Sequence, residues 1–127
     1  MKVTFPGGKQ VEALYKGFTV QTDQPVVSGG EGSAPSPFDL FLCSIGTCAE
    51  FYVLDFCQHR GIPYRDIQLN VAMRKNQNTG LIGKIKIGIK LPADFPDQYK
   101  EAVVKAAMVC TVKKHLAEPP EIEIEVV

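Results

Sequence analysis

Two cysteines that lie far apart in the sequence are the residues best suited to chemistry in this chain. Cys48 lies in a long apolar segment, Phe38–Phe56, and Cys110 lies in the short stretch Met108–Val112. A thiol in one helix does little alone, but a second thiol at the start of another helix could resolve its oxidised form as a disulfide. The pair therefore makes this chain a candidate redox enzyme.

The other cysteines and the histidines do not indicate a metal site. No Cys-x-x-Cys pair is present, and His59 and His115 do not fall at zinc-like spacing from the cysteines. Cys43 and Cys57 do not share a helical face with Cys48 by i+3 or i+4 spacing. We expect both to be packing residues and expect no metal cofactor.

Composition restricts the class of protein and its partners. The 127 residues fit one domain, 1–127, and the chain is 45% hydrophobic, with 14 basic and 14 acidic residues. The absence of a block of like charges argues against a nucleic-acid partner. No signal peptide is recognised at the N-terminus, which predicts a cytoplasmic location. Asp39, Glu50 and Asp55 interrupt the apolar segment and would each cost about 2.5–3.5 kcal/mol at a bilayer centre, so we expect no membrane span.

Alternating apolar residues predict antiparallel strands. Two runs, 67–74 and 84–91, flank the turn-forming residues 76–80 and so predict a hairpin. Three shorter runs at the N-terminus, separated by glycine-containing turns, predict a strand meander over Val3–Phe5, Gln10–Tyr15 and Phe18–Thr22. The run Glu121–Val126 alternates in the same way and predicts a closing strand.

A long central helix is predicted between the meander and the hairpin. Ser36 and Asp39 form a capping box, Pro37 suits the first helical position, and Gly61 predicts an end near Arg60. The helix is apolar on nearly all sides and would be about 37 Å long. A chain of this size has a radius of gyration of only about 14 Å. We therefore expect a partner subunit to help cover the helix.

A second helical region is predicted from Pro96-Asp97 to a point before Pro119-Pro120, and it contains Cys110. Periodicity favours one continuous helix, because no glycine or proline stands near Cys110. A break is the alternative. The difference matters, because a cysteine at a helix N-terminus has a stabilised thiolate, whereas one inside an apolar helix has a raised pKa.

Four polar residues near these elements have simpler interpretations. Glu50 falls in the apolar helix near Cys48, and a buried carboxylate needs a partner, so we expect it either to pair with a lysine or to face a crevice of the dimer. His59 is placed as a favourable cation near a helix C-terminus, His115 on a solvated face, and Glu31 in a glycine-rich turn. Neither histidine demands a catalytic role, whereas Glu50 is harder to dismiss.

The stretches around the two cysteines resemble the two cysteine motifs of the OsmC/Ohr family of hydroperoxide-reducing proteins. The first comprises Gly29–Leu42 followed by Ile45-Gly46-Thr47-Cys48, and the second is Cys110–Leu116. The order of the predicted elements is also similar to that of the family, including Arg60-Gly61-Ile62 after the long helix. The resemblance covers essentially the whole chain.

The resemblance implies an α+β fold in an intertwined homodimer, with two long helices enclosed by sheets built from both chains. Cys48 would be the thiolate that an organic hydroperoxide or hydrogen peroxide oxidises to a sulfenic acid. Cys110 would resolve it to a disulfide, which a dithiol such as a dihydrolipoyl group or thioredoxin would reduce. No metal, flavin or haem would be needed.

The chain also departs from the family pattern. Members of the family use an arginine from the N-terminal part and a glutamate ten positions before the first cysteine, where this chain has Phe38. Proline usually follows the second cysteine, where this chain has Thr111. The arginines here all follow the apolar segment; they are Arg60, Arg65 and Arg74. The available substitutes are the acids Glu31, Asp39 and Glu50 and the lysines Lys2, Lys9 and Lys16.

Two other functions are compatible with the same residues. The dimer could bind a small hydrophobic ligand without turnover, which the missing arginine and glutamate favour. Alternatively, the Cys48–Cys110 bridge could form in a thiol redox sensor for which peroxide is not the physiological oxidant.

Overall fold

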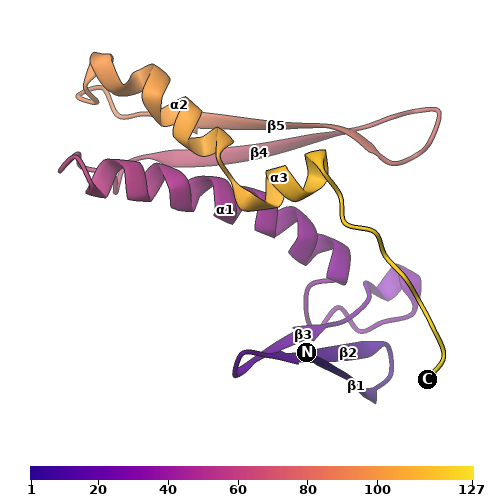
Figure 1. The fold of residues 1–127 in the computed structure, drawn as a ribbon. Coiled ribbons are helices and arrows are strands. Elements are labelled where there is room, and N and C mark those ends of the chain that lie inside the picture. Colours follow the sequence, from indigo (N-terminus) through magenta and orange to yellow (C-terminus); the bar gives the residue numbers. More distant parts are fainter. The chain divides into compact units, whose positions relative to one another are not determined.

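The computed structural model describes all 127 residues and confirms the predicted α+β class. It contains antiparallel strands, three α-helices and two short 3-10 helices (Figure 1). The chain divides into two compact units, Met1–Cys43 and Ser44–Val127.

The first unit begins with the predicted meander. Strands β1 (Lys2–Gly7), β2 (Gln10–Tyr15) and β3 (Phe18–Thr22) form an antiparallel sheet in that order. Lys16 and Gly17 connect β2 to β3 with φ values of 50° and 84°, which is the pair of positive φ angles that a type I′ hairpin turn requires. The meander is confirmed.

The loop after β3 is organised by a buried carboxylate that the sequence analysis missed. Asp23 is 1% exposed, and its side chain accepts hydrogen bonds from the backbone N–H groups of Gln24, Glu31 and Ser33 and from the Ser33 hydroxyl. Gly30 is required nearby, because a Cβ there would lie 1.9 Å from the Gln24 carbonyl oxygen. The glycine-rich stretch therefore wraps around one aspartate.

These hydrogen bonds make the loop sensitive to acid. The Ser33 N–H is the largest influence, and the bonds together outweigh the opposing effect of burial and lower the pKa of Asp23 from 3.8 to about 2. The carboxylate therefore stabilises the fold above pH 3.8, and this contribution is lost as the pH falls through about 2.

We expect Asp23→Asn to lower the midpoint of thermal unfolding at pH 7, because an amide presents N–H groups to the donors around it. The difference from wild type should shrink as the pH falls toward 2, since wild type then loses the same charge. Thermal unfolding of both proteins, followed by circular dichroism at several pH values, measures this difference in midpoint. A difference that stays constant down to pH 2 would contradict this role of the carboxylate.

Helix α1 (Pro37–Gln58) starts at the predicted capping box. The Ser36 N–H donates to Asp39 Oδ2 at 3.0 Å, and the Asp39 N–H donates to Ser36 Oγ at 3.2 Å. Asp39 is thereby explained as a cap. The helix ends two residues before the predicted Arg60, and Gly61 follows it with a φ of 64°.

In the second unit the predicted hairpin is confirmed. Strands β4 (Gln68–Lys75) and β5 (Ile82–Lys90) pair antiparallel, with Gln68 opposite Lys90 and Arg74 opposite Lys84. They form a two-stranded sheet, so each strand keeps one unpaired edge. Leu69 and Ile89 lie on the face that packs against the core of the unit.

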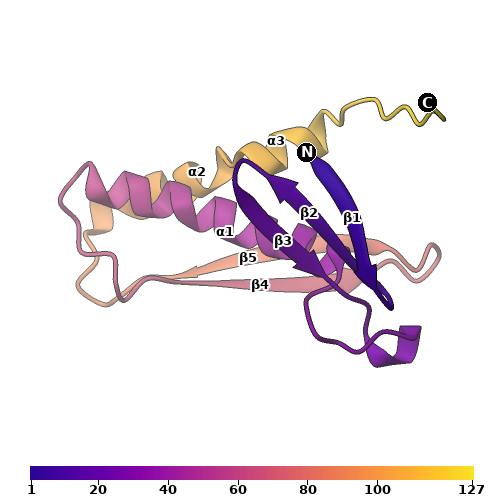
Figure 2. The ribbon, with the colours of Figure 1, turned by 90° about the horizontal axis from the view of Figure 1, so that it is seen from below.

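The core of the second unit joins α1 to the second helical region. That region consists of a 3-10 turn, Asp97–Tyr99, then α2 (Lys100–Met108) and α3 (Thr111–Ala117). Figure 2 shows the hairpin along one side of α1, and α2 along another. The buried residues at their meeting are Val53, Cys57, Ile62, Ile67, Phe95, Val103 and Ala107.

By length and composition alone, α1 could cross a membrane, with a mean hydropathy of 1.5. Its most buried residues, however, fall at intervals of four and form one stripe, which in the second unit reaches the core described above. They are Ile45, Ala49, Val53 and Cys57. This is the pattern of a helix that packs on a protein core.

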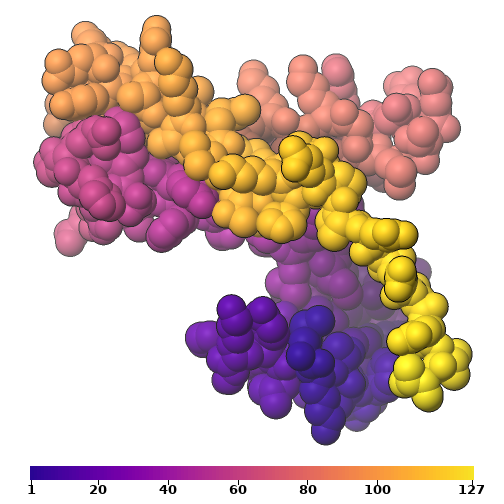
Figure 3. Space-filling view, viewed as in Figure 1, coloured from indigo at the N-terminus to yellow at the C-terminus, as the bar shows by residue number.

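The predicted closing strand is wrong for the single chain. Residues Glu121–Val126 have no regular secondary structure. Ile122 and Ile124 are 81% and 95% exposed, and Figure 3 shows this segment in yellow, with its side chains at the surface. The alternation supplies one apolar face, but a strand also needs hydrogen bonds to the edge of another strand, and in the single chain this segment is not paired with any strand.

Candidate thiol site

Cys48 and Cys110 lie together in the second unit. Cys48 is half-buried on α1, and Cys110 is fully buried between α2 and α3. Their side chains are hydrogen-bonded to each other, and none of the cysteines is in a disulfide. The structure therefore brings together the two residues that the sequence analysis selected.

The helix breaks at Cys110, so the expectation of a continuous helix is wrong. The Val109 N–H bonds back to the Ala106 carbonyl oxygen at 3.0 Å and closes α2. Cys110 then has φ −49° and ψ 124°, outside the helical range, and the Lys114 N–H donates to its carbonyl oxygen as α3 begins. The last carbonyl groups of a helix have no partner within that helix. At the end of α2, Lys113 Nζ donates to one of them, the carbonyl oxygen of Ala107.

The break supplies hydrogen-bond donors to Cys48. The first N–H groups of a helix have no partner within that helix. Those of Thr111 and Val112 donate to the Cys48 sulfur. The same break that ends α2 thus turns two backbone donors toward the thiol on α1.

The surroundings push the ionisation of the two thiols in opposite directions. Partial burial alone raises the pKa of Cys48, but the hydrogen bond from Cys110, the two N–H groups and the positive charge of Lys113 outweigh it, so this pKa is lowered. Burial and the hydrogen bond to Cys48 raise the pKa of Cys110. The arrangement favours a Cys48 thiolate that accepts a hydrogen bond from a neutral Cys110 thiol.

The charged residue beside Cys48 is one that the sequence analysis did not select. Lys113 contributes the positive charge, whereas Arg60 lies beyond the end of α1, at the far end of that helix from Cys48. Glu50 is exposed in the single chain and lines a small cleft with Arg65, so it is not buried within this chain. Two positions along a helix from Cys48, it projects toward a different face.

The other cysteines and His115 lie in different surroundings. Cys57 is in the apolar core, where burial raises its pKa, as expected for a packing residue. Cys43 is exposed, so the expectation that it packs in the interior is wrong. His115 is exposed and bonds through Nδ1 to the Thr111 carbonyl oxygen at 2.9 Å. The structure has no group of three or more potential ligands that could hold a metal ion.

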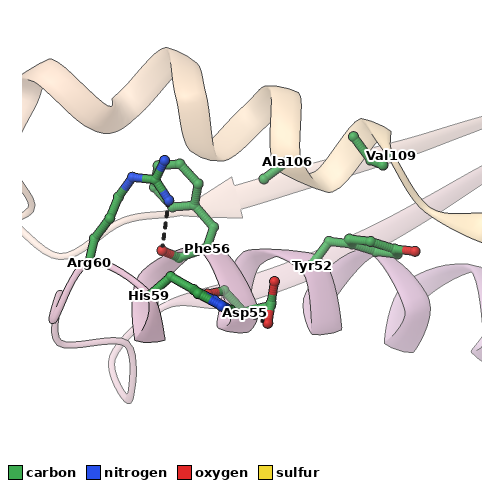
Figure 4. Close-up of a pocket in the computed structure, with 7 residues that line it drawn as sticks. All are labelled: Tyr52, Asp55, Phe56, His59, Arg60, Ala106 and Val109. Carbon is green, nitrogen blue, oxygen red and sulfur yellow. Dashed lines mark hydrogen bonds and ion pairs between the residues drawn. The ribbon is translucent and has the colours of Figure 1, made fainter.

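A cleft of about 600 Å³ lies between α1 and α2, beginning at Tyr52, one helical turn from Cys48 (Figure 4). The Arg60 guanidinium lies 4.0 Å from the centroid of the Phe56 ring and bonds to the Phe56 carbonyl oxygen at 3.4 Å. His59 Nδ1 lies 3.3 Å from an oxygen of Asp55. The side chains of Asp55, His59 and Arg60 make the cleft polar at the end that lies away from Cys48.

Comparisons of the sequence and of the structure with known proteins agree with each other. A family model described as OsmC-like protein matches residues 30–125. An osmotic stress induced and detoxification response protein from Psychrobacter arcticus 273-4 is 23% identical, with a TM-score of 0.73 over 89% of this chain and 84% of that one. An organic hydroperoxide resistance protein OsmC from Legionella pneumophila, also described as a redox protein, is 22% identical, with a TM-score of 0.55 over 91% and 85%. No curated protein gives a significant match.

Proposed function

Because the chain belongs to the OsmC-like protein family, we propose that it reduces organic hydroperoxides, with Cys48 and Cys110 as its reactive thiols. The observation that carries the proposal is the hydrogen-bonded pair itself, in which Cys48 has the lowered pKa and Cys110 the raised one. A peroxide-reducing cysteine must react as the thiolate. The similarity to the Legionella organic hydroperoxide resistance protein supports an organic hydroperoxide over hydrogen peroxide as the substrate.

The proposed reaction uses the two sulfurs in turn. The Cys48 thiolate attacks the terminal oxygen of the hydroperoxide, so an S–O bond forms, the O–O bond breaks, and the alkoxide takes a proton from solvent and leaves as the alcohol. Cys110 loses its proton and attacks the sulfenic acid at Cys48, which forms the S–S bond and releases the oxygen as water. A dithiol of the dihydrolipoyl or thioredoxin type then returns two electrons and two protons. These steps use no metal or organic cofactor.

We further propose that residues 1–127 act as one functional domain in a cytoplasmic homodimer. Support comes from apolar side chains that the single chain leaves uncovered. Phe5 and Phe18 of the sheet are 82% and 74% exposed, Phe51 of α1 is 57% exposed, and Ile124 lies in the unpaired C-terminal segment. Exposed apolar surface of this kind marks an interaction site.

The test of the proposed function is a single oxidation of the reduced protein. One equivalent of cumene hydroperoxide should produce a disulfide between Cys48 and Cys110, identified by peptide mass spectrometry after the remaining thiols are blocked. In Cys110→Ser, the same treatment should leave a sulfenic acid at Cys48 that dimedone traps. Cys43→Ser is the matched control and should form the disulfide as wild type does.

The other two functions give different results in this experiment or in a turnover assay with a dithiol. A ligand-binding protein would leave both thiols reduced and consume no peroxide. A redox sensor would form the disulfide but would not turn over when a dithiol is present. The cleft near Tyr52 does not favour a purely hydrophobic ligand, because Asp55, His59 and Arg60 line it.

A further inference from the structure

A hydroxyl pair ties α1 to the start of α3 beside the thiols. Tyr52 follows Cys48 by four residues on α1, so the two side chains lie on the same face of the helix. The Tyr52 hydroxyl is 3.0 Å from Thr111 Oγ1, with either group able to donate. Thr111 follows Cys110 directly and is the first residue of α3.

We propose that Tyr52 is a positioning residue for Cys48: by holding Thr111, its hydroxyl keeps the first N–H groups of α3 directed at the Cys48 sulfur. The inference rests on the proposed function for its importance to catalysis. Its geometry is independent of that function, because the bond joins the helix that carries the thiol to the residue that donates to it.

The segment that Tyr52 holds has few other restraints. Helix α3 has only seven residues and none of them is fully buried, so neither its length nor its packing fixes its position strongly. Lys113 ties it back to α2 through the Ala107 carbonyl oxygen, and the buried Cys110 anchors the junction. The Tyr52–Thr111 bond supplies a direct tie between α3 and α1, which carries Cys48.

Loss of this tie should weaken the bonds to the thiolate without changing any charge near it. The titratable groups that act on Cys48 are Cys110 and Lys113, both from the α2–α3 junction and α3, and Glu50 on α1 projects elsewhere. None of the three is altered by Tyr52→Phe. A change in the ionisation of Cys48 in that variant would therefore report the direction of the backbone N–H groups.

The experiment measures the pH dependence of Cys48 alkylation by iodoacetamide in the reduced protein, resolved at each cysteine by peptide mass spectrometry. Tyr52→Phe and Thr111→Val should each raise the midpoint by about half a pH unit, which is about a threefold loss of thiolate below the midpoint. Thr111→Ser keeps the hydroxyl and should retain the wild-type midpoint. The double variant Tyr52→Phe, Thr111→Val should shift it no further than either single change.

Tyr64→Phe is the matched control, because Tyr64 lines the other cleft, with Glu50, and should leave the midpoint unchanged. An unchanged Cys48 midpoint in Tyr52→Phe overturns the inference, whatever happens to its thermal stability. If Thr111→Val does not fold, Tyr52→Phe decides the question alone. Alkylation needs no peroxide, so this result is independent of whether the protein reduces hydroperoxides.

Discussion

Replacing Cys48 by serine should abolish turnover of cumene hydroperoxide in the presence of a dithiol reductant, with a rate loss of about a thousandfold or more. The reason is chemical: the attacking atom must be a polarisable thiolate, and a serine hydroxyl is not ionised at neutral pH. In wild type the rate should rise with pH through the Cys48 pKa, because only the deprotonated form reacts. Its midpoint should lie below the ordinary thiol value of 9.0, since the pKa of Cys48 is lowered.

Two controls separate the roles of the thiols. Cys43→Ser removes an exposed cysteine from the same helix and should retain wild-type turnover. Without the dithiol, Cys110→Ser should still consume about one equivalent of peroxide per chain and then stop, because the first oxidation needs only Cys48 and no second thiol then resolves the sulfenic acid. If Cys48→Ser retained steady turnover, or if Cys110→Ser lost even the first equivalent, the assignment of the two thiols would be wrong.

Local signals in the sequence predicted the elements that carry the site. The capping box at Ser36 and Asp39 set the start of α1, and alternation of apolar residues set β4 and β5. These features depend on residues within a few positions of one another, so a single sequence contains them. The two cysteines were selected by their chemistry and by the resemblance of the segments around them to known motifs.

The helix break at Cys110 could not be predicted in this way, because its causes are not local. Lys113 reaches back to the carbonyl oxygen of Ala107, and the first N–H groups of α3 are satisfied by a sulfur on α1. The only local signal was weak: Thr111 and Val112 are β-branched and slightly disfavour a helix interior. Lys113 itself was overlooked because nothing in the sequence places it beside Cys48.

Asp23 shows a similar limit to what can be predicted from the sequence. An aspartate before a glycine-rich stretch suggests a turn, but not that donors eight and ten residues later fold back onto it. The C-terminal segment shows the opposite case, because its alternation was recognised and yet the segment pairs with no strand in the single chain. In both cases the pattern is visible, and the partner is not.

The C-terminal segment and the hairpin have complementary patterns, which suggests where the missing partner lies. One face of β5 carries exposed lysines and the other carries half-buried isoleucines: Lys84, Lys86 and Lys90, and Ile85, Ile87 and Ile89. Ile89 packs against the core of the second unit. The segment after α3 alternates glutamates with apolar residues: Glu121, Glu123 and Glu125, and Ile122, Ile124 and Val126. Added along the unpaired edge of β5, it would place carboxylates beside lysines on one face and extend the apolar face on the other.

We therefore expect the proposed homodimer to depend on pairing of this segment with β5 of the second copy. Changing the three glutamates to lysine should weaken the dimer about tenfold or more, since each opposite-charge pair across strands contributes about 0.2–1 kcal/mol and becomes repulsive on reversal. Changing the three β5 lysines to glutamate should have the same effect. Sedimentation velocity over a range of protein concentrations measures the dissociation.

Combining both sets of substitutions restores opposite charges and should restore the dimer, which a general loss of stability would not allow. The control replaces three exposed lysines that lie outside β5, so that its net charge changes as much as in the β5 variant, and it should leave dissociation of the dimer unchanged. Its substitutions are Lys9→Glu, Lys105→Glu and Lys114→Glu. A wild-type monomer at all concentrations would exclude the pairing between copies. If the charge reversals instead altered thermal stability equally at every concentration, the segment would pair with β5 of its own chain, and the uncovered side chains of α1 would need another partner.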